Sequence, residues 1–259
     1  MNILDKIVAQ KKIEIELAKQ AVSTKQLEQT FFFNRKTISL KENLLKENST
    51  GIIAEFKRKS PSKGVINDQF SAVDIVKQYE YAGVAGSSIL TDEPFFGGTQ
   101  QDLISVRSKV QIPLLRKDFM IDEYQFAEAK SIGADVVLLI ASILTPKEVK
   151  DFTNIAKSLE LEVLLELHDE TELDHVYHLV DMVGINNRNL KTFEVDIEQS
   201  IRMAEKVGND YVKVAESGIS TIQTLKHFKN NGFKGFLIGE NFMKTENPGL
   251  ACQQFIQEF

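Results

Sequence analysis

Short runs of apolar residues recur along the chain from residue 52 onward, and amphipathic stretches separate them. Bounded apolar runs of this length predict buried β-strands, which we place at residues 52–56, 87–90, 112–116, 135–140, 162–167, 182–186, 211–215 and 235–238. Strands that alternate with helices form parallel sheets with right-handed crossovers. Eight such units over roughly 210 residues fit a single (β/α)8 barrel, the TIM barrel, within one α/β domain.

A doubly wound open sheet is the alternative arrangement of alternating strands and helices. Its nucleotide-binding versions carry glycine-rich fingerprints after the first strand. No GxGxxG follows the first strand here, and no GxxxxGK[ST] occurs in the chain. The closed barrel is therefore the favoured prediction.

Several stretches between the strands have helical spacing and recognisable ends. Residues 72–82 form one apolar stripe that Gly83 closes as a C-cap. The sequence Thr-Pro-Lys-Glu at residues 145–148 combines a capping box with proline at the first helical position. Further helices are predicted at residues 169–180, 196–207, 220–230 and 250–259.

A helical extension at residues 1–48 precedes the predicted barrel at residues 49–259. Residues 3–20 carry apolar side chains at helical spacing, three phenylalanines follow at 31–33, and a second amphipathic piece ends near residue 45. Eight units can close a barrel without this extension, yet its apolar stripe must be covered. We therefore expect it to lie over the barrel mouth and to shield the site from water.

Composition excludes several classes of protein. The formal net charge of −6 gives no support to a nucleic-acid partner. No apolar run approaches the roughly 20 residues that span a bilayer, and the first residues lack the apolar core of a signal peptide, so we expect a cytoplasmic protein without membrane contact. Cys252 is the single cysteine, which excludes a disulfide framework. His175 and His178 could chelate a metal, but their spacing favours an ordinary helix.

Polar residues end several of the predicted strands, where the active site of a barrel lies. Residues two apart on a strand face the same side, and each of these polar residues is in phase with inward apolar positions. Strand ends that merely face solvent would show no such shared phase. We therefore predict one polar mouth, formed by Glu55 and Lys57 at the end of the first strand, Lys117 at the end of the third, Glu166 of the fifth, Asn186 of the sixth and Glu216 of the seventh.

The loops after the last two strands have the composition of a phosphate site. Ser217-Gly218 follows the seventh strand and Gly239-Glu240 follows the eighth. Glycines let backbone N–H groups approach an anion closely, and barrels often bind phosphate at these two loops. The basic run at residues 57–63 suits a small anion as well.

Seven segments resemble the indole-3-glycerol phosphate synthase family, in the order in which the family has them. They are IAEFKRKSPSKG, LTDEPFFGG, LLRKDF, LLELHDE, GINNRNL, VAESGI and LIGENFM, and they span residues 52–243. The helical extension also resembles the family. The resemblance implies a lyase of tryptophan biosynthesis that acts on a small phosphosugar, 1-(2-carboxyphenylamino)-1-deoxyribulose 5-phosphate. The ring closes with loss of carbon dioxide and water, without cofactor or metal, and we expect a monomer or a weak homo-oligomer.

The resemblance also implies a role for each residue that matches a family motif. Lys117 is implied as the general acid and Glu166 as the general base. The supporting polar set comprises Lys57, Glu55, Asn186 and Glu216. The expected contacts to the substrate's anionic groups are Ser60, Arg188, Ser217, Gly218, Gly239 and Glu240, and the candidates for its aromatic half are Phe95, Phe96 and Phe119. Asn187 and Asn189 depart from the family pattern, where a serine or threonine and an aspartate are expected, but neither is inward by phase.

Two rival functions remain to be separated from this one. A phosphoribosylanthranilate isomerase would share the phosphate end but should not need Glu55 and Lys57 together with Lys117. A catalytically silent phosphosugar-binding protein would keep the glycines and lose Lys117 or Glu166, whereas both are present.

Overall fold

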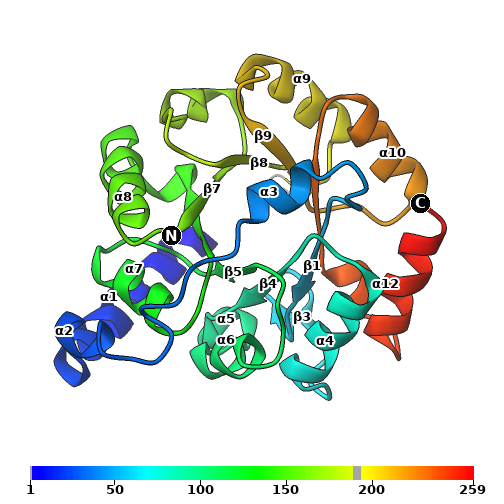
Figure 1. The fold of residues 1–259 in the computed structure, drawn as a ribbon. Coiled ribbons are helices and arrows are strands. Elements are labelled where there is room, and N and C mark those ends of the chain that lie inside the picture. Colours follow the sequence, from blue (N-terminus) through cyan, green and yellow to red (C-terminus); the bar gives the residue numbers. More distant parts are fainter. Residues whose placement is uncertain (1, 189–193) are drawn as a thin grey trace.

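The computed structural model describes residues 2–188 and 194–259, and its central feature is a closed barrel of eight parallel strands (Figure 1). Each barrel strand pairs with the next along the chain, and β1 pairs with β10 to close the ring. The barrel prediction is therefore confirmed and the open sheet excluded. The strands are β1 (Ile52–Phe56), β4 (Gly86–Leu90), β5 (Leu114–Lys117), β6 (Val136–Ile140), β7 (Glu162–Leu167), β8 (Met182–Asn186), β9 (Val212–Glu216) and β10 (Gly235–Ile238).

Helices surround the barrel, between successive strands and after the last one (Figure 1). They are α4 (Ala72–Ala82), α5 (Glu93–Phe96), α6 (Gln100–Arg107), α7 (Tyr124–Ser131), α8 (Pro146–Ser158), α9 (Ile197–Val207), α10 (Ile222–Asn230), α11 (Glu240–Met243) and α12 (Pro248–Gln257). Gly83 ends α4 in the left-handed region, and the Thr145 capping box starts α8, both as predicted. Within the described ranges, no helix has both the length and the apolar character needed to cross a membrane.

The prediction of a helix at residues 169–180 is wrong. A short 3-10 helix, η2 (Glu170–His175), takes its place, and the chain turns extended at Val176. Helices α8 and α9 both pack against η2, so they already cover this side of the barrel and one short turn fills the remaining space. The ring nitrogens of His175 lie within hydrogen-bond distance of the Glu172 and Leu144 carbonyls.

The inward phase of the barrel strands is confirmed by the core. One apolar cluster lies inside the barrel and includes Ile53, Leu115, Leu164 and Val214. Each of these residues lies two positions before a polar residue of the predicted mouth. The two-residue period of a strand therefore carries the inward face from the apolar interior up to the charged rim.

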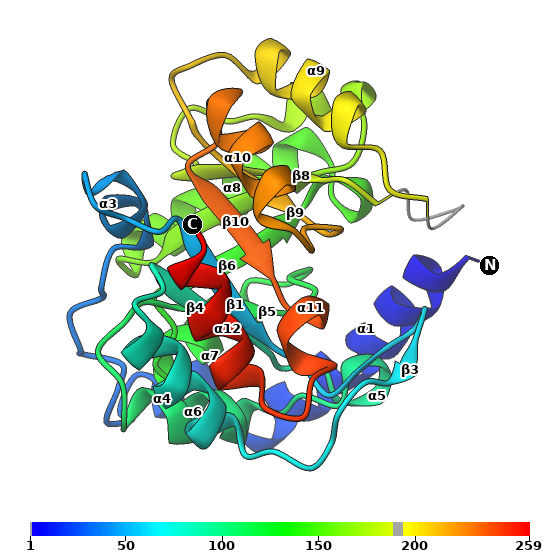
Figure 2. The same cartoon turned by 90° about the vertical axis from the view of Figure 1, so that its right-hand side faces the viewer.

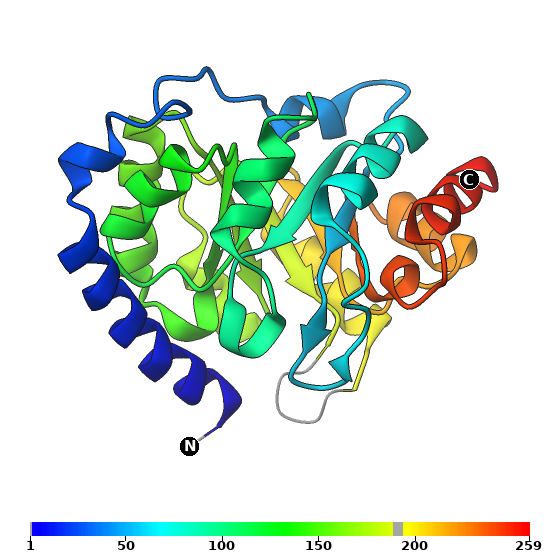
Figure 3. The same cartoon turned by 90° about the horizontal axis from the view of Figure 1, so that it is seen from below.

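The N-terminal extension contacts both ends of the barrel, which corrects the expectation that all of it covers the mouth. It contains α1 (Ile3–Ala21), α2 (Thr24–Leu27) and α3 (Leu40–Leu45). Leu40 and Leu44 of α3 join the inner apolar cluster, and a Leu40 methyl group lies close to Gly86 at the start of β4. Figure 3 shows α3, in blue, at one end of the barrel and the N-terminus at the other. Helix α3 thus closes the amino-terminal end of the barrel.

Helix α1 runs along the barrel toward the mouth. Figures 2 and 3 show its first turns at the same end of the barrel as the small hairpin formed by β2 (Lys59–Ser60) and β3 (Gly64–Val65). Ile3, Leu4 and Ile7 line the cavity at the mouth. Only this part of the extension can therefore shield the site.

We predict that Leu40→Ala lowers the free energy of unfolding by about 2–5 kcal/mol, because it empties a fully buried position in the inner cluster. Urea unfolding followed by circular dichroism measures the change. Leu45→Ala on the same helix is the control, since Leu45 is 51% exposed and should change stability little. Equal effects of the two substitutions would contradict the closing role of α3.

Candidate active site

A cavity of about 310 Å³ opens at the carboxyl ends of the strands. The structure brings nearly all of the sequence-predicted site residues to its wall. They are Glu55, Lys57, Ser60, Lys117, Phe119, Glu166, Asn186, Arg188, Glu216, Ser217, Gly218, Gly239 and Glu240. The described part of the chain thus forms one polar mouth, as the phase of the strand ends predicts.

Four charged side chains form a layer across this mouth. Each lies at or next to the last residue of its strand, Glu55 on β1, Lys117 on β5, Glu166 on β7 and Glu216 on β9, and these are alternate strands of the ring. Side chains from alternate strands form one layer in barrels of this kind. The Lys117 ammonium lies 2.8 Å from Glu166 Oε2 and 2.7 Å from Glu216 Oε2. The half-buried Lys117 ammonium therefore contacts two of the three buried carboxylates of the layer.

The imbalance of charge in this layer shifts the pKa values of its members. Burial lowers the pKa of Lys117, but the charges of Glu166, Glu216 and Glu55 outweigh it and raise that pKa well above its ordinary value. Burial raises the pKa of Glu216 to about 7, against the opposing effect of Lys117. Burial also disfavours ionised Glu166, yet Lys117 and His168 hold its pKa well below its ordinary value. At neutral pH the layer holds an ammonium, an ionised Glu166 and a Glu216 near its midpoint.

Lys57, the second lysine of the mouth, forms an ion pair with Glu55. Lys57 Nζ lies 2.7 Å from Glu55 Oε1. A Cβ at Gly239 would come 2.5 Å from the same oxygen. Gly239 therefore makes room for Glu55, which is a role that the sequence did not indicate.

Glu166 has two further partners. Asn186 donates a hydrogen bond of 2.9 Å from Nδ2 to Glu166 Oε1, and His168 Nε2 lies 2.9 Å from the same oxygen. Burial lowers the pKa of His168, but Glu166 and Glu172 raise it to about 10. His168 has no role predicted from the sequence, although it lies two residues beyond Glu166 and so shares its phase.

The loop after β9 has a strained backbone at the predicted phosphate end. Ser217 and Gly218 adopt φ angles of 69° and 73°, and such a conformation in a residue other than glycine is a feature of functional sites. Asn187 Nδ2 donates a 2.6 Å hydrogen bond to the Ser217 carbonyl. The strand phase predicts that Asn187 does not face the interior of the barrel. Its side chain instead stabilises the loop after β9 through this hydrogen bond. Asn189 lies outside the described residues.

Two of the three phenylalanines predicted to contact the aromatic half of the substrate line the cavity, and Phe95 does not. Phe96 and Phe119 line the cavity with their ring centroids 5.9 Å apart. Phe95 is not part of the cavity wall and packs partly buried against the inner apolar cluster. The two neighbours lie on the short helix α5, where successive side chains diverge, and only the structure distinguishes them.

In the described part of the chain, no group of three or more histidine, cysteine, aspartate or glutamate residues has an arrangement that could hold a metal ion.

The fold and the mouth define a (β/α)8 barrel with a layer of four charged residues at the carboxyl ends of its strands. The family model of indole-3-glycerol phosphate synthase matches residues 4–255. The chain belongs to the indole-3-glycerol phosphate synthase family. This places it among the carboxy-lyases of tryptophan biosynthesis.

Individual relatives are similar in sequence over almost the whole chain. The indole-3-glycerol phosphate synthase of Bacteroides thetaiotaomicron is 48% identical over 256 residues, which are 99% of this chain and 98% of that protein. The enzyme of Campylobacter fetus subsp. fetus is 42% identical and covers 95% of each chain.

Two solved structures are similar in fold. A mutant tryptophan synthase α-subunit of Pyrococcus furiosus has a TM-score of 0.61 at 12% identity, over 80% of this chain and 96% of that one. The 3-hexulose-6-phosphate synthase of Salmonella typhimurium has a TM-score of 0.61 at 14% identity, over 80% and 99%. At these identities the similarity concerns the barrel fold alone.

We predict that His168 stabilises the fold in a pH-dependent way. Its pKa is about 10 in the folded chain and about 6.5 when unfolded, so its stabilisation is complete below about pH 6.5 and is lost as the pH rises through 10. The difference in unfolding free energy between wild type and His168→Gln should shrink over this window. Denaturant unfolding at several pH values measures it.

His227→Gln is the matched control, because His227 pairs with Glu198 at the surface and exposed pairs contribute little. A wild-type advantage over His168→Gln that stays constant from pH 6 to 10 would contradict the assignment.

Proposed function

We propose that this chain closes the indole ring of 1-(2-carboxyphenylamino)-1-deoxyribulose 5-phosphate, with Lys117 as general acid and Glu166 as general base. The observation that carries the proposal is the position of the Lys117 ammonium between Glu166 and Glu216 in the buried layer at the mouth. The carboxylates keep Lys117 protonated in the free site, so it holds the proton that the substrate's keto oxygen takes, and a neighbouring carboxyl group can return one to it. The family implies the reaction, and this layer supplies the proton transfers that it needs.

The first step requires an electrophilic carbonyl. An ammonium that hydrogen-bonds the substrate's keto oxygen draws electrons from its carbon, and the ring carbon that bears the carboxylate then forms the new C–C bond. The oxygen takes a proton from Lys117 and becomes a hydroxyl group. Carbon dioxide leaves and returns its bonding electrons to the ring, which restores aromaticity.

The second step removes water. The hydroxyl group leaves with a proton from an acid, while a base removes a proton from nitrogen or carbon to form the indole double bond. Glu166 is ionised because its pKa is low, so it is ready to accept that proton. Glu216 has a pKa of about 7, which suits a group that returns protons to Lys117 near neutral pH.

The two ends of the cavity suit the two ends of this substrate. Phe119 follows β5 and Ser217 follows β9, and these strands lie four positions apart in a ring of eight. The aromatic pair Phe96 and Phe119 therefore faces the phosphate loops across the mouth. A substrate with an aromatic ring at one end and a phosphate at the other spans this distance with its keto group near Lys117.

An assay for indole formation tests the proposal directly. The chain contains no tryptophan, so indole absorbance and fluorescence from the product appear against a low protein background. The carboxyphenylamino sugar phosphate is added with a chelator present and without added metal. Absence of an indole signal from folded protein would refute the function, and activity that vanishes only with chelator would refute the metal-free account.

We predict that Lys117→Met and Glu166→Gln each lower turnover by roughly two to four orders of magnitude, the usual range for one acid–base group. Both substitutions keep the shape of the side chain and remove the proton transfer. Steady-state kinetics measures the effect, and Lys57→Met separates the two lysines. If Lys57→Met abolishes turnover while Lys117→Met is nearly silent, Lys57 is the acid instead.

We predict that Arg188→Met raises both KM and the inhibition constant of inorganic phosphate about tenfold or more, the usual effect of losing a charged hydrogen bond. Arg188 lines the phosphate end of the cavity, and its Nη2 lies 3.9 Å from Glu240 Oε2. Arg202→Met is the control, because Arg202 is exposed on α9. A rise in KM without weaker phosphate inhibition would place Arg188 elsewhere on the substrate.

A further inference from the structure

A lysine occupies the centre of the buried stripe of α1. The buried residues of this helix are Ile7, Lys11 and Ile15, which are spaced four apart and so share one face. Lys11 is 4% exposed. Its neighbours on the stripe are apolar, so the lysine departs from the pattern by which the helix docks on the barrel.

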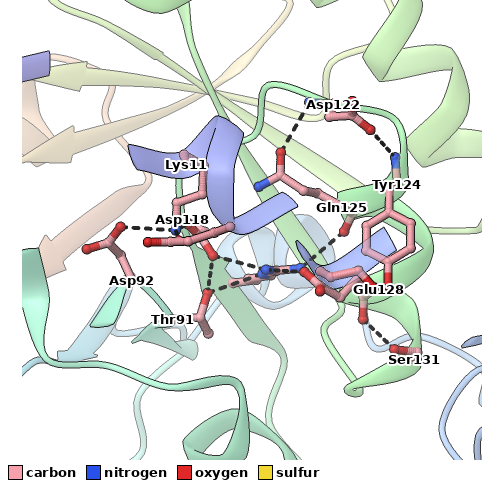
Figure 4. Close-up of polar contacts among 12 residues, drawn as sticks. Lys11, Thr91, Asp92, Asp118, Asp122, Tyr124, Gln125, Glu128 and Ser131 are labelled. Atoms are coloured by element: carbon pink, nitrogen blue, oxygen red, sulfur yellow. Dashed lines mark hydrogen bonds and ion pairs between the residues drawn. The ribbon is translucent and has the colours of Figure 1, made fainter. Parts of the chain in front are cut away.

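The Lys11 ammonium reaches two aspartates at the mouth of the barrel (Figure 4). Its Nζ lies 3.0 Å from Asp92 Oδ2, 3.0 Å from Asp118 Oδ1 and 2.8 Å from Glu14 Oε2. Burial lowers the pKa of Lys11, but Asp118, Asp92 and Glu14 raise it well above its ordinary value. The contact is therefore a buried ion pair at physiological pH.

Each aspartate supports a different part of the site. Asp118 directly follows Lys117 and lines the cavity, and its Oδ2 also accepts hydrogen bonds from Thr91 Oγ1 at 2.6 Å and Arg116 Nη2 at 3.0 Å. These contacts hold the backbone at the end of β5 (Figure 4).

Asp92 supports the aromatic side of the mouth. It is the N-cap of α5 and accepts a 2.9 Å hydrogen bond from the Phe95 backbone N–H. Helix α5 carries Phe96, which lines the cavity beside Phe119. The Lys11 ammonium thus contacts both Asp118, the residue next to Lys117, and Asp92, the N-cap of the helix that carries Phe96.

An apolar contact could dock α1 on the barrel in place of this ion pair. Well-packed apolar residues in place of a buried ion pair are often neutral or stabilising, because burial of the charges costs much of what their attraction returns. An apolar residue between Ile7 and Ile15, opposite apolar partners, would complete the stripe. The two aspartates therefore point to a task at the mouth.

We propose that Lys11 is a positioning residue for the ring-closure reaction, which couples helix α1 to Lys117 through Asp118 and to Phe96 through Asp92. The inference rests on the proposed function, because Lys117 and the aromatic pair are given their roles there. The N-terminal helix thereby sets the geometry of the acid and of the aromatic slot, while the phosphate loops across the mouth are held independently of it.

The test compares Lys11→Met with Lys19→Met. Both lysines lie on α1 and both pair with an aspartate of the barrel, but Lys19 and Asp122 form an exposed pair with Nζ 2.8 Å from Oδ2. The readouts are kcat, KM and the inhibition constant of inorganic phosphate, in protein whose near-ultraviolet circular dichroism matches wild type.

We expect Lys11→Met to lower kcat/KM about ten- to hundredfold, the scale of a misplacement of about 1 Å at a reacting centre. The phosphate inhibition constant should stay at the wild-type value, and Lys19→Met should leave all three quantities unchanged. A kcat/KM equal to that of Lys19→Met would overturn the proposal. Phosphate inhibition that weakens in parallel would also overturn it, because the whole mouth would then have loosened.

Lys11→Met leaves two buried aspartates without their cation and can therefore fail to fold. A second variant keeps the proposal testable in that case. Lys11→Met/Asp92→Asn removes one of the two charges, and a lower kcat/KM in this folded variant supports the proposal. Wild-type kcat/KM in it, or failure of both variants to fold, would overturn the positioning role. An inactive wild-type protein would refute the proposed function instead.

Discussion

The Lys117 ammonium is the charge on which the mouth of this barrel depends. Three buried carboxylates, Glu55, Glu166 and Glu216, belong to the same layer, and burial of unpaired carboxylates is costly. Lys117 contacts two of them directly and attracts the third. Burial raises the pKa of Glu216 to about 7 against the attraction of Lys117, and the charges of Glu166 and Glu55 add to the rise. The distribution of protons within the layer thus follows from burial and from the charges of its members.

Space for these charges comes from residues without side chains. A Cβ at Gly184 would lie 2.2 Å from Glu216 Oε1, and one at Gly239 would lie 2.5 Å from Glu55 Oε1. The interior of a barrel is closely packed, so a large polar side chain fits only where a neighbouring strand supplies a gap. The layer therefore requires glycine at both positions, because a side chain at either one would displace the neighbouring carboxylate.

The N-terminal extension stabilises the barrel from one end and shapes its mouth from the other. Helix α3 buries Leu40 and Leu44 in the inner cluster, a packing contribution to stability. Helix α1 places Ile3, Leu4 and Ile7 at the cavity and brings Lys11 to the aspartates beside it. The extension therefore packs against the barrel near both of its ends.

The local pattern of the chain was sufficient for the barrel and for the members of its charged layer, because strand phase is a property of neighbouring residues. The pairing of Lys117 with Glu166 and Glu216, the choice of Phe96 over Phe95, the ion pairs of Lys11 and the short turn at η2 did not follow from it. Each of these depends on contacts between segments far apart in the chain. Such contacts exist only once the ring of strands has closed and the extension has packed against both of its ends.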